Sequence, residues 1–180
     1  MNRKRILKYG ILILVAGIFF LISPYPAAVP TPTPILPTPN SNPNIVTAKV
    51  VNVVDGDTFK IESGETVRMI GIDTPETVHP SKPAQCYGKE ASSKTQDLLE
   101  GKEIKLEKDV SEKDKYGRLL RYVYVGEIFV NEYLVKEGFA VSSSYPPDIK
   151  YQDKFVEAQR KAREENKGLW NPSAICQTPL

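Results

Sequence analysis

The sequence predicts an α+β fold, in which five short strands form a small closed β-barrel and three helices pack on one side. From Ile45 onward, short runs rich in β-branched and aromatic residues are separated by turn signals such as Asp-Gly and Ser-Gly. Between these runs lie segments with apolar residues at helical spacing, and each of them ends at a glycine. Five strands are fewer than a sandwich normally contains, so a barrel is favoured.

The strands are expected where the turn signals divide the chain. Residues 45–54 are β-branched and apolar and end at Asp55-Gly56, which is a strong hairpin signal. Further strands are expected at residues 58–62, 65–72, 103–109 and 118–125. The first three strands have tight connections and therefore predict an antiparallel meander. A five-stranded, partly open Greek-key barrel of this kind is the OB-fold.

The helices are expected at residues 88–100, 130–138 and 151–168, each closed by a glycine at or just after its end. The last of them is amphipathic, because Phe155, Ala158 and Ala162 fall on one face. We expect this face to pack on the rest of the domain.

The N-terminus reads as a targeting segment. Residues 1–10 carry four basic and no acidic side chains, and residues 11–22 are apolar throughout. This pattern predicts that residues 1–23 are a signal peptide or an N-terminal membrane anchor, and the sequence leaves both open. Basic residues before the apolar run place the remainder of the chain outside the cytoplasm. The expected location is therefore extracytoplasmic, either secreted or anchored to the membrane.

A spacer separates this segment from the globular part. Residues 24–44 are rich in proline and threonine and contain no charged residue, a composition typical of an extended linker. Residues 45–180 then form the globular domain, with 20 basic and 22 acidic side chains. The basic pI of the whole chain comes from the targeting segment and is no sign of nucleic-acid binding.

Two cysteines, Cys86 and Cys176, both lie in the exported part. In an oxidising compartment an isolated pair predicts one disulfide, and a loop this long would gain about 4–5 kcal/mol from it if the bond is unstrained. The alternative is two unrelated buried thiols. Two cysteines and one histidine do not make a zinc site of the usual composition.

Two acidic motifs, DGDT at 55–58 and DTPE at 73–76, mark the candidate site. Each one alone is an ordinary polar turn. If the first hairpin and the third strand pair antiparallel, Asp57, Asp73 and Glu76 converge at one rim. Three carboxylates in one place need a positive charge among them, and a hard divalent cation, Ca²⁺ or Mg²⁺, fits best.

Basic residues supply the other half of the candidate site. Arg68 lies five residues before Asp73, an odd offset that places it on the opposite strand face unless a bulge re-aims it. In the segment DKYGR, Lys115, Tyr116 and Arg118 surround a glycine, and such groups suit contacts to phosphate and to base or sugar. The alternative for this segment is an exposed charged loop.

Taken together and in this order, VVDGDTFKI, VRMIGIDTPET and KDKYGRLLRYVYV resemble the staphylococcal nuclease (thermonuclease) family, as do YGKEAS and GLW. The resemblance spans about residues 47–171. It implies the OB barrel with helices and a calcium-dependent hydrolysis of DNA and RNA that leaves 3′-phosphate products. The expected cofactor is Ca²⁺, the expected partner is nucleic acid, preferably single-stranded, and the expected state is a monomer.

The resemblance also implies roles for individual residues. The predicted metal ligands are the carboxylates of Asp57 and Asp73 and the backbone carbonyl of Thr74. The predicted catalytic residues are Arg68, Glu76 and Arg118, with Glu76 as general base. Lys115 and Tyr116 are expected beside the substrate phosphate. The segment VSSSYPPDIKY lacks a clear pair of substrate-stacking tyrosines, and Tyr145 is the candidate for one of them.

Two other functions compete with this prediction. A non-catalytic nucleic-acid-binding OB module would have the same fold, but it would be expected to lack some of the ligands and arginines that this chain retains. A surface domain that uses calcium only for stability would explain the carboxylates and the linker. It leaves Arg68 and the DKYGR segment without a role.

Overall fold

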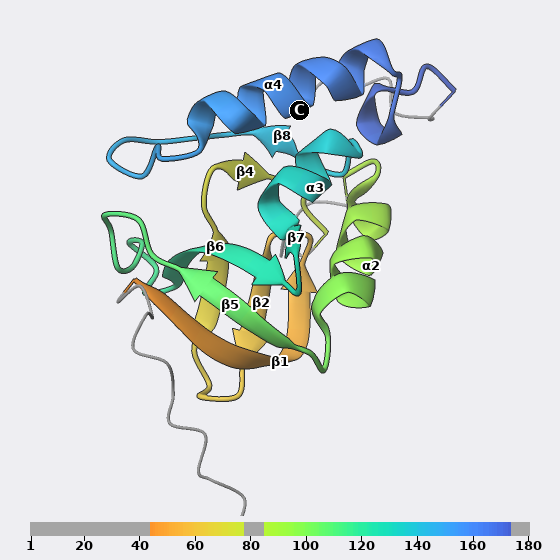
Figure 1. Ribbon diagram of the computed structural model, residues 1–180. Helices are drawn as coiled ribbons and strands as arrows, with labels where there is room; N and C mark the ends of the chain where they lie inside the picture. Colours follow the sequence, from red (N-terminus) through yellow and green to blue (C-terminus); the bar gives the residue numbers. More distant parts are fainter. Residues whose placement is uncertain (1–43, 78–84, 174–180) are drawn as a thin grey trace, which may run out of the picture. The chain divides into compact units, whose positions relative to one another are not determined.

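The computed structural model describes residues 44–77 and 85–173 and has the predicted barrel (Figure 1). The barrel strands are β1 (Ile45–Asp55), β2 (Thr58–Ile61), β3 (Thr66–Met69), β5 (Glu103–Glu107) and β6 (Leu119–Val125), and a short strand β7 (Ile128–Phe129) extends the sheet. Their order is β3-β2-β1-β5-β6-β7, and a further pairing of β3 with β6 closes the sheet on itself. The prediction of a five-stranded OB barrel with three helices is confirmed.

The long strand β1 is what makes closure possible. Its first half, Ile45–Lys49, pairs antiparallel with β5, and its second half pairs antiparallel with β2. Register shifts near Asn52 and Asp55 let the strand turn from one partner to the other, since bulges bend a strand and increase its twist. The predicted β1–β2 hairpin is present, with Asp55 paired to Thr58 and with Gly56 and Asp57 as the two turn residues.

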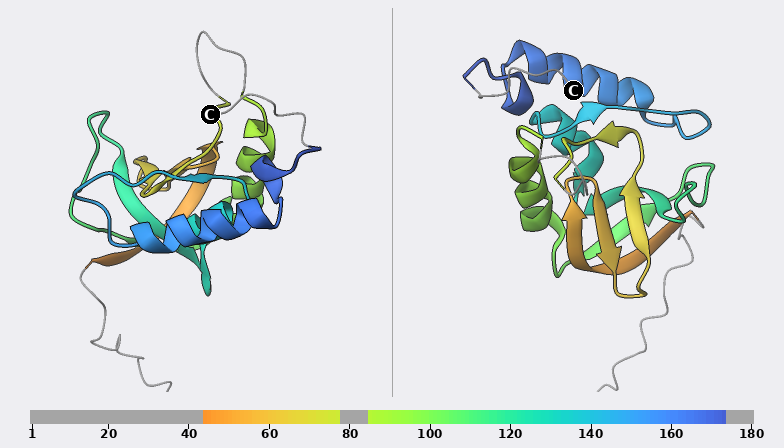
Figure 2. Two further views of the ribbon diagram at one scale, coloured as in Figure 1. Left: turned by 90° about the horizontal axis from the view of Figure 1, so that it is seen from above. Right: turned by 180° about the vertical axis from the view of Figure 1, so that it is seen from behind.

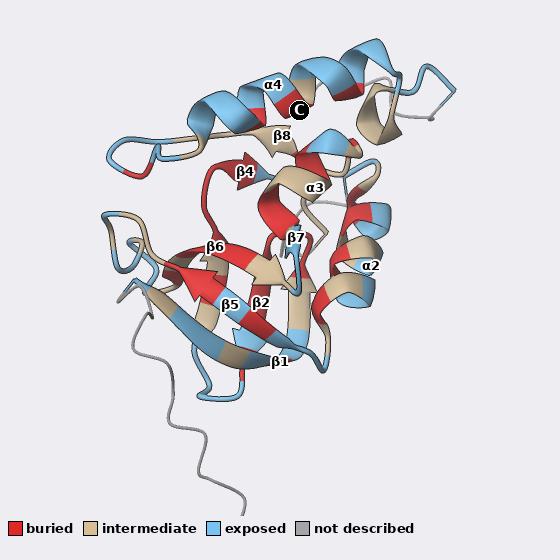
Figure 3. Ribbon diagram, in the orientation of Figure 1, coloured by how far each residue is buried: buried red, intermediate tan, exposed pale blue. Residues whose placement is uncertain are grey.

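Three helices complete the domain, namely α2 (Gly88–Leu99), α3 (Val130–Lys136) and α4 (Gln152–Glu164), followed by a 3₁₀ turn η1 (Gly168–Trp170). Helix α2 lies beside the barrel, and α4 lies across α3 at one end (Figures 1 and 2). The predicted face of α4 is confirmed, because Phe155, Ala158 and Ala162 are its buried residues. Buried residues line the barrel interior and the inner faces of the helices, while the outer face of α4 is exposed (Figure 3).

The third strand is shorter than predicted. Instead of a single strand over 65–72, β3 ends at Met69 and the chain turns through Gly71, which has φ +78°. A new two-residue strand, β4 (Ile72–Asp73), then pairs with β8 (Val141–Ser142) in a separate small sheet. Glycine is required here, because a Cβ at Gly71 would lie 2.5 Å from the ring of Phe155.

Part of the predicted organisation lies outside the described residues. This holds for the targeting segment 1–23, for the linker 24–44 apart from its last residue, and for Cys176. Across residues 44–77 and 85–173, no helix is long and apolar enough to cross a membrane.

Candidate active site

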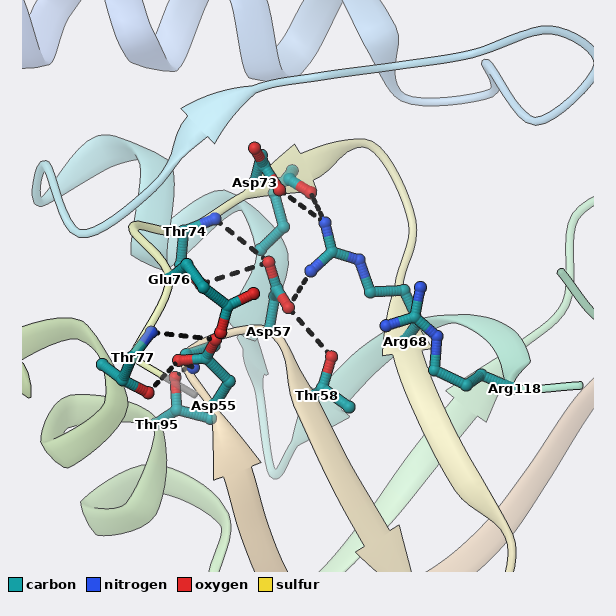
Figure 4. Close-up of polar contacts among 12 residues, drawn as sticks. Asp55, Asp57, Thr58, Arg68, Asp73, Thr74, Glu76, Thr77, Thr95 and Arg118 are labelled. Carbon is teal, nitrogen blue, oxygen red and sulfur yellow. Dashed lines mark hydrogen bonds and ion pairs between the residues drawn. The ribbon is translucent and has the colours of Figure 1, made fainter. Parts of the chain in front are cut away.

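Asp57 is the buried centre of the acidic rim, by which we mean the side chains of Asp55, Asp57, Asp73 and Glu76 (Figure 4). Asp57 is only 1% exposed. One carboxylate oxygen accepts hydrogen bonds from the backbone N–H of Thr74 at 3.0 Å and from its hydroxyl at 3.1 Å. The other accepts from the hydroxyl of Thr58 at 3.0 Å. Asp57 therefore ties the first hairpin to the chain leaving β4.

Arg68 turns toward this rim. Its guanidinium is ion-paired with Asp57 and, at 2.7 Å, with Asp73, and it also donates to the carbonyl of Ile72 at 3.3 Å. The odd offset between Arg68 and Asp73 does not separate them, because the turn at Gly71 interrupts the strand alternation between the two residues. One guanidinium thus lies between two carboxylates, that of Asp57 in the β1–β2 turn and that of Asp73 on β4 (Figure 4).

Asp55 and Glu76 form the second half of the rim. Asp55 accepts from the backbone of Gly56 at 2.8 Å and from the hydroxyl of Thr77 at 2.7 Å. Burial, and then the neighbouring carboxyl of Glu76, raise the pKa of Asp55 above its ordinary value. The rim is therefore divided into two pairs of carboxyl groups. Arg68 bridges Asp57 and Asp73, and the side chain of Asp55 interacts directly with that of Glu76, beyond its role in the turn.

The predicted convergence of three carboxylates on one metal position is not found. In the described ranges, no group of three or more His, Cys, Asp or Glu side chains is arranged to hold a metal ion. The chemistry of the donor set nevertheless fits a hard cation. The oxygen of Asp57 and the oxygen of Asp73 that contact Arg68 already bracket one positive charge, and carboxylate oxygens are the ligands that Ca²⁺ and Mg²⁺ prefer.

Arg118 is positioned by Asp114, the first residue of the DKYGR segment, whose role was not predicted. Asp114 accepts from the backbone N–H groups of Tyr116 and Arg118 at 2.9 and 3.0 Å, and from Nε of Arg118 at 2.7 Å. Gly117 has φ +82°, which favours glycine. The side chains of Lys115 and Arg118 both lie over the ring of Tyr116. The signal was present, because an Asp that opens a turn commonly accepts backbone hydrogen bonds.

The two arginines line one open cavity of about 680 Å³. Its walls include Lys115, Tyr116 and Tyr145, and the residues Tyr116 and Tyr145 are 72% and 75% exposed. The cavity thus carries cationic and aromatic groups, and through Arg68 it adjoins the acidic rim. An open, cationic cavity with exposed rings has the chemistry to receive a phosphate and the bases beside it.

The comparison with known proteins identifies the family of this chain. The sequence model of the family described as staphylococcal nuclease homologue matches residues 66–172, which is more than half of the chain. The chain belongs to the staphylococcal nuclease family. The resemblance seen in the sequence motifs is thereby confirmed.

Members of the staphylococcal nuclease family with high similarity include two thermonucleases. The thermonuclease of Staphylococcus hyicus is 46% identical over 134 residues, which cover 73% of this chain and 79% of that protein. The thermonuclease of Staphylococcus intermedius is 45% identical over 124 residues, covering 67% of this chain and 74% of that protein. Endonuclease YncB of Bacillus subtilis is 41% identical over 135 residues, covering 69% of this chain and 64% of that protein.

Most predicted site residues come together in this family member. Asp57, Arg68 and Asp73 are in direct contact, Thr74 contacts Asp57 through its N–H and hydroxyl, and Glu76 lies against Asp55. The structure places Arg118, Lys115, Tyr116 and Tyr145 around the cavity instead of on the rim. Cys86 directly precedes α2, and its predicted partner Cys176 lies outside the described residues, so that pairing stays a prediction.

Proposed function

We propose that this protein is a nuclease that hydrolyses phosphodiester bonds of DNA and RNA and leaves 3′-phosphate products. The observation that carries the proposal is that Arg68 and Arg118 line the same open cavity while Arg68 also joins the acidic rim. The names of its relatives, two thermonucleases and an endonuclease, support the same activity. A binding module would need the cationic cavity but not an acidic rim beside it.

In this proposal the scissile phosphate lies between the two guanidinium groups. Arg68 and Arg118 donate hydrogen bonds to its non-bridging oxygens, and they bind most strongly when charge builds up on those oxygens in the transition state. Asp114 holds Arg118 through Nε, which leaves the outer edge of the guanidinium directed at the substrate. Removing one such donor typically lowers the rate about 10²–10³-fold.

Glu76 acts as the general base. It takes a proton from a water molecule, whose oxygen then attacks phosphorus. The bond from phosphorus to the 5′-oxygen breaks, that oxygen takes up a proton from solvent to leave as a hydroxyl, and the phosphate stays on the 3′ side. Asp57, Asp73 and the carbonyl of Thr74 would hold Ca²⁺, which supplies Lewis-acid stabilisation of phosphoryl charge when bound. Between them, the two halves of the acidic rim have separate tasks: one holds the cation and the other handles the proton.

Substrate selection follows from the cavity wall. Lys115 adds positive charge beside the phosphate, and Tyr116 and Tyr145 offer their exposed ring faces to bases. Stacking of a base on an aromatic ring contributes about 1–3 kcal/mol and needs unpaired bases, so single-stranded substrate is favoured.

The nuclease domain, residues 45–180, is proposed to act outside the cytoplasm as a monomer. Residues 1–23 would direct export as a signal peptide or stay as a membrane anchor, and residues 24–44 would separate the domain from the membrane. A disulfide between Cys86 and Cys176 would join the start of α2 to the C-terminal segment.

The deciding experiment measures cleavage of a single-stranded DNA oligonucleotide with Ca²⁺ or with a chelator. We expect cleavage in the presence of Ca²⁺ and none in the presence of the chelator. In Glu76→Gln we expect kcat to fall by about 10²–10⁴-fold, because the amide cannot accept the proton. Glu90→Gln, an exposed position on α2, is the matched control and should keep full activity. DNA binding without cleavage by the unaltered protein would instead favour the non-catalytic OB module.

A further inference from the structure

The backbone of Glu76 is held in place by hydrogen bonds to Gln85. Its N–H donates to the side-chain oxygen Oε1 of Gln85 at 2.7 Å. The backbone N–H of Gln85 donates in return to the carbonyl of Glu76 at 2.8 Å. Two hydrogen bonds in opposite directions thus join the same two residues, and one of them depends on the side chain of Gln85.

Gln85 is itself fixed to helix α2. Its carbonyl accepts from the N–H of Gly88, the first residue of that helix, at 3.1 Å. Gly88 is buried against the rim segment, since a Cβ there would lie 2.8 Å from the Thr77 side chain and 3.0 Å from the carbonyl of Pro75. The first turn of α2 therefore packs directly on the carbonyls of Pro75 and Glu76 and on the side chain of Thr77, and Gln85 connects that helix to this segment.

The opposite side of the segment is held by the hairpin. Asp57 accepts from the N–H of Thr74, and Asp55 accepts from the hydroxyl of Thr77. The backbone is thus fixed two residues before Glu76 and one residue after it. Gln85 contributes the contact at Glu76 itself.

We infer that Gln85 is a positioning residue for Glu76, which it holds by accepting the Glu76 N–H and thereby keeps the carboxylate in place for proton transfer. The inference rests on the proposed function, because it takes Glu76 to be the base. Gln85 does not line the cavity, so it acts on Glu76 and not on substrate binding. Catalysis is sensitive to such placement, since a shift of about 1 Å can cost about 10²-fold in rate.

The test compares two variants of nearly equal size. Gln85→Glu keeps an oxygen that can accept the Glu76 N–H, whereas Gln85→Met has the same length but no acceptor. The loss of one hydrogen bond of ordinary strength should lower kcat by about tenfold in Gln85→Met, with KM within about twofold of the unaltered protein. Gln85→Glu should retain most of kcat. Lys89→Met, an exposed substitution in the first turn of α2, is the control and should behave as the unaltered protein.

A second measurement needs no activity. The amide of Glu76 should exchange with solvent about tenfold faster in Gln85→Met than in Gln85→Glu, as followed by NMR on full-length protein with circular dichroism as the check of folding. If exchange changes as expected but neither the unaltered protein nor any variant cleaves DNA, then Gln85 holds the Glu76 backbone but the proposed function is wrong. If Gln85→Met leaves both the exchange and kcat unchanged, or raises KM as much as it lowers kcat, the positioning role is wrong.

Discussion

Two buried acids of this protein, Asp57 and Glu107, differ in whether they share their cation with another acid. Both are almost inaccessible, at 1% and 4% exposure. Glu107 accepts hydrogen bonds from the hydroxyls of Tyr124 at 2.9 Å and Tyr151 at 3.1 Å, and it is ion-paired with Lys150. Burial alone would raise the pKa of Glu107, but these donors outweigh it and hold the pKa below its ordinary value.

The surroundings of Glu107 make a closed structural unit. The acid lies on β5, Tyr124 on β6 and Tyr151 at the start of α4, so their hydrogen bonds join three elements. The ring of Tyr124 also stacks on Phe129 at 4.6 Å between ring centres. One acid is matched here by one cation and two hydroxyls, and nothing further is needed to balance its charge.

Asp57 lies in a rim with an excess of negative charge. It shares the single guanidinium of Arg68 with Asp73, while Asp55 lies against Glu76. Like charges at this distance destabilise one another unless a cation or a proton intervenes. The comparison indicates that a buried acid with a structural role, Glu107, is neutralised by a cation of the fold. The acids of the candidate active site outnumber the one guanidinium beside them, so a further cation would stabilise them.

The largest effect is expected when a positive charge, that of Arg118, is removed from the cavity. We expect Arg118→Ala to lower kcat by about 10²–10³-fold because one donor to the transition state is lost. The melting temperature should change little, since in the described part of the chain the side chain of Arg118 contacts only the partly buried Asp114 and the exposed ring of Tyr116. Arg160→Ala, on the exposed face of α4, is the control. A loss of stability equal to the loss of activity would show that Arg118 belongs with the fold-building charges.

Calcium should stabilise the protein by binding at the acidic rim. At a concentration of about 100 times its dissociation constant, Ca²⁺ should raise the free energy of unfolding by about 2.7 kcal/mol. In Asp73→Asn this gain should largely disappear, while stability without calcium should stay within about 0.5 kcal/mol, because the side chain of Asp73 is 56% exposed. Chemical denaturation with and without Ca²⁺ measures both. An undiminished calcium effect in this variant would remove Asp73 from the metal site.

Glu107 should show the reverse behaviour. Glu107→Gln replaces a charged acceptor of three hydrogen bonds, so we expect a loss of about 1–3 kcal/mol in the free energy of unfolding. Activity per folded molecule and the calcium effect should stay unchanged. Glu103→Gln, an exposed position on the same strand, is the matched control for denaturation measurements. A calcium effect that falls together with stability would contradict the separation of the two regions.

The pH dependence of stability should carry the signature of Glu107. Because its pKa is lower in the folded than in the unfolded protein, the stabilisation is fully present above the unfolded value near 4.5 and is lost as the pH falls through the folded pKa. Denaturation between pH 6 and pH 3, a range of about three units around that value, should show a smaller loss of stability in Glu107→Gln than in the unaltered protein. Equal pH profiles would show that Glu107 is not responsible.

Much of the fold follows from the sequence because its signals are local. Turn glycines and β-branched runs predicted the barrel strands, and the spacing of Phe155, Ala158 and Ala162 predicted the buried face of α4. The break at Gly71 was missed, since a glycine inside an apolar run resembles a continuous strand. What decides it is the ring of Phe155, which occupies the space beside Gly71 from 84 residues further along the chain.

The site was predicted in its residue types but not in its pairings. The motifs placed the carboxylates of Asp57, Asp73 and Glu76 at one rim, and the family resemblance added Arg68. In the structure Arg68 bridges Asp57 and Asp73, whereas Glu76 lies against Asp55. Asp114 was missed although its turn signals it, whereas Gln85 has no such signal and contributes through hydrogen bonds with the backbone of Glu76. Such contacts depend on loop geometry, which residue type alone does not encode.

The parallel pairing of β3 with β6 has a consequence for how the activity arises during folding. It sets Arg68 opposite Leu120, two residues after Arg118, although the two arginines are 50 positions apart in the chain. Contacts between such distant segments form late, since loop closure must precede them. The guanidiniums of Arg68 and Arg118 therefore come together only once β3 has paired with β6. A chain that is still unfolded carries every residue of the site and no assembled site.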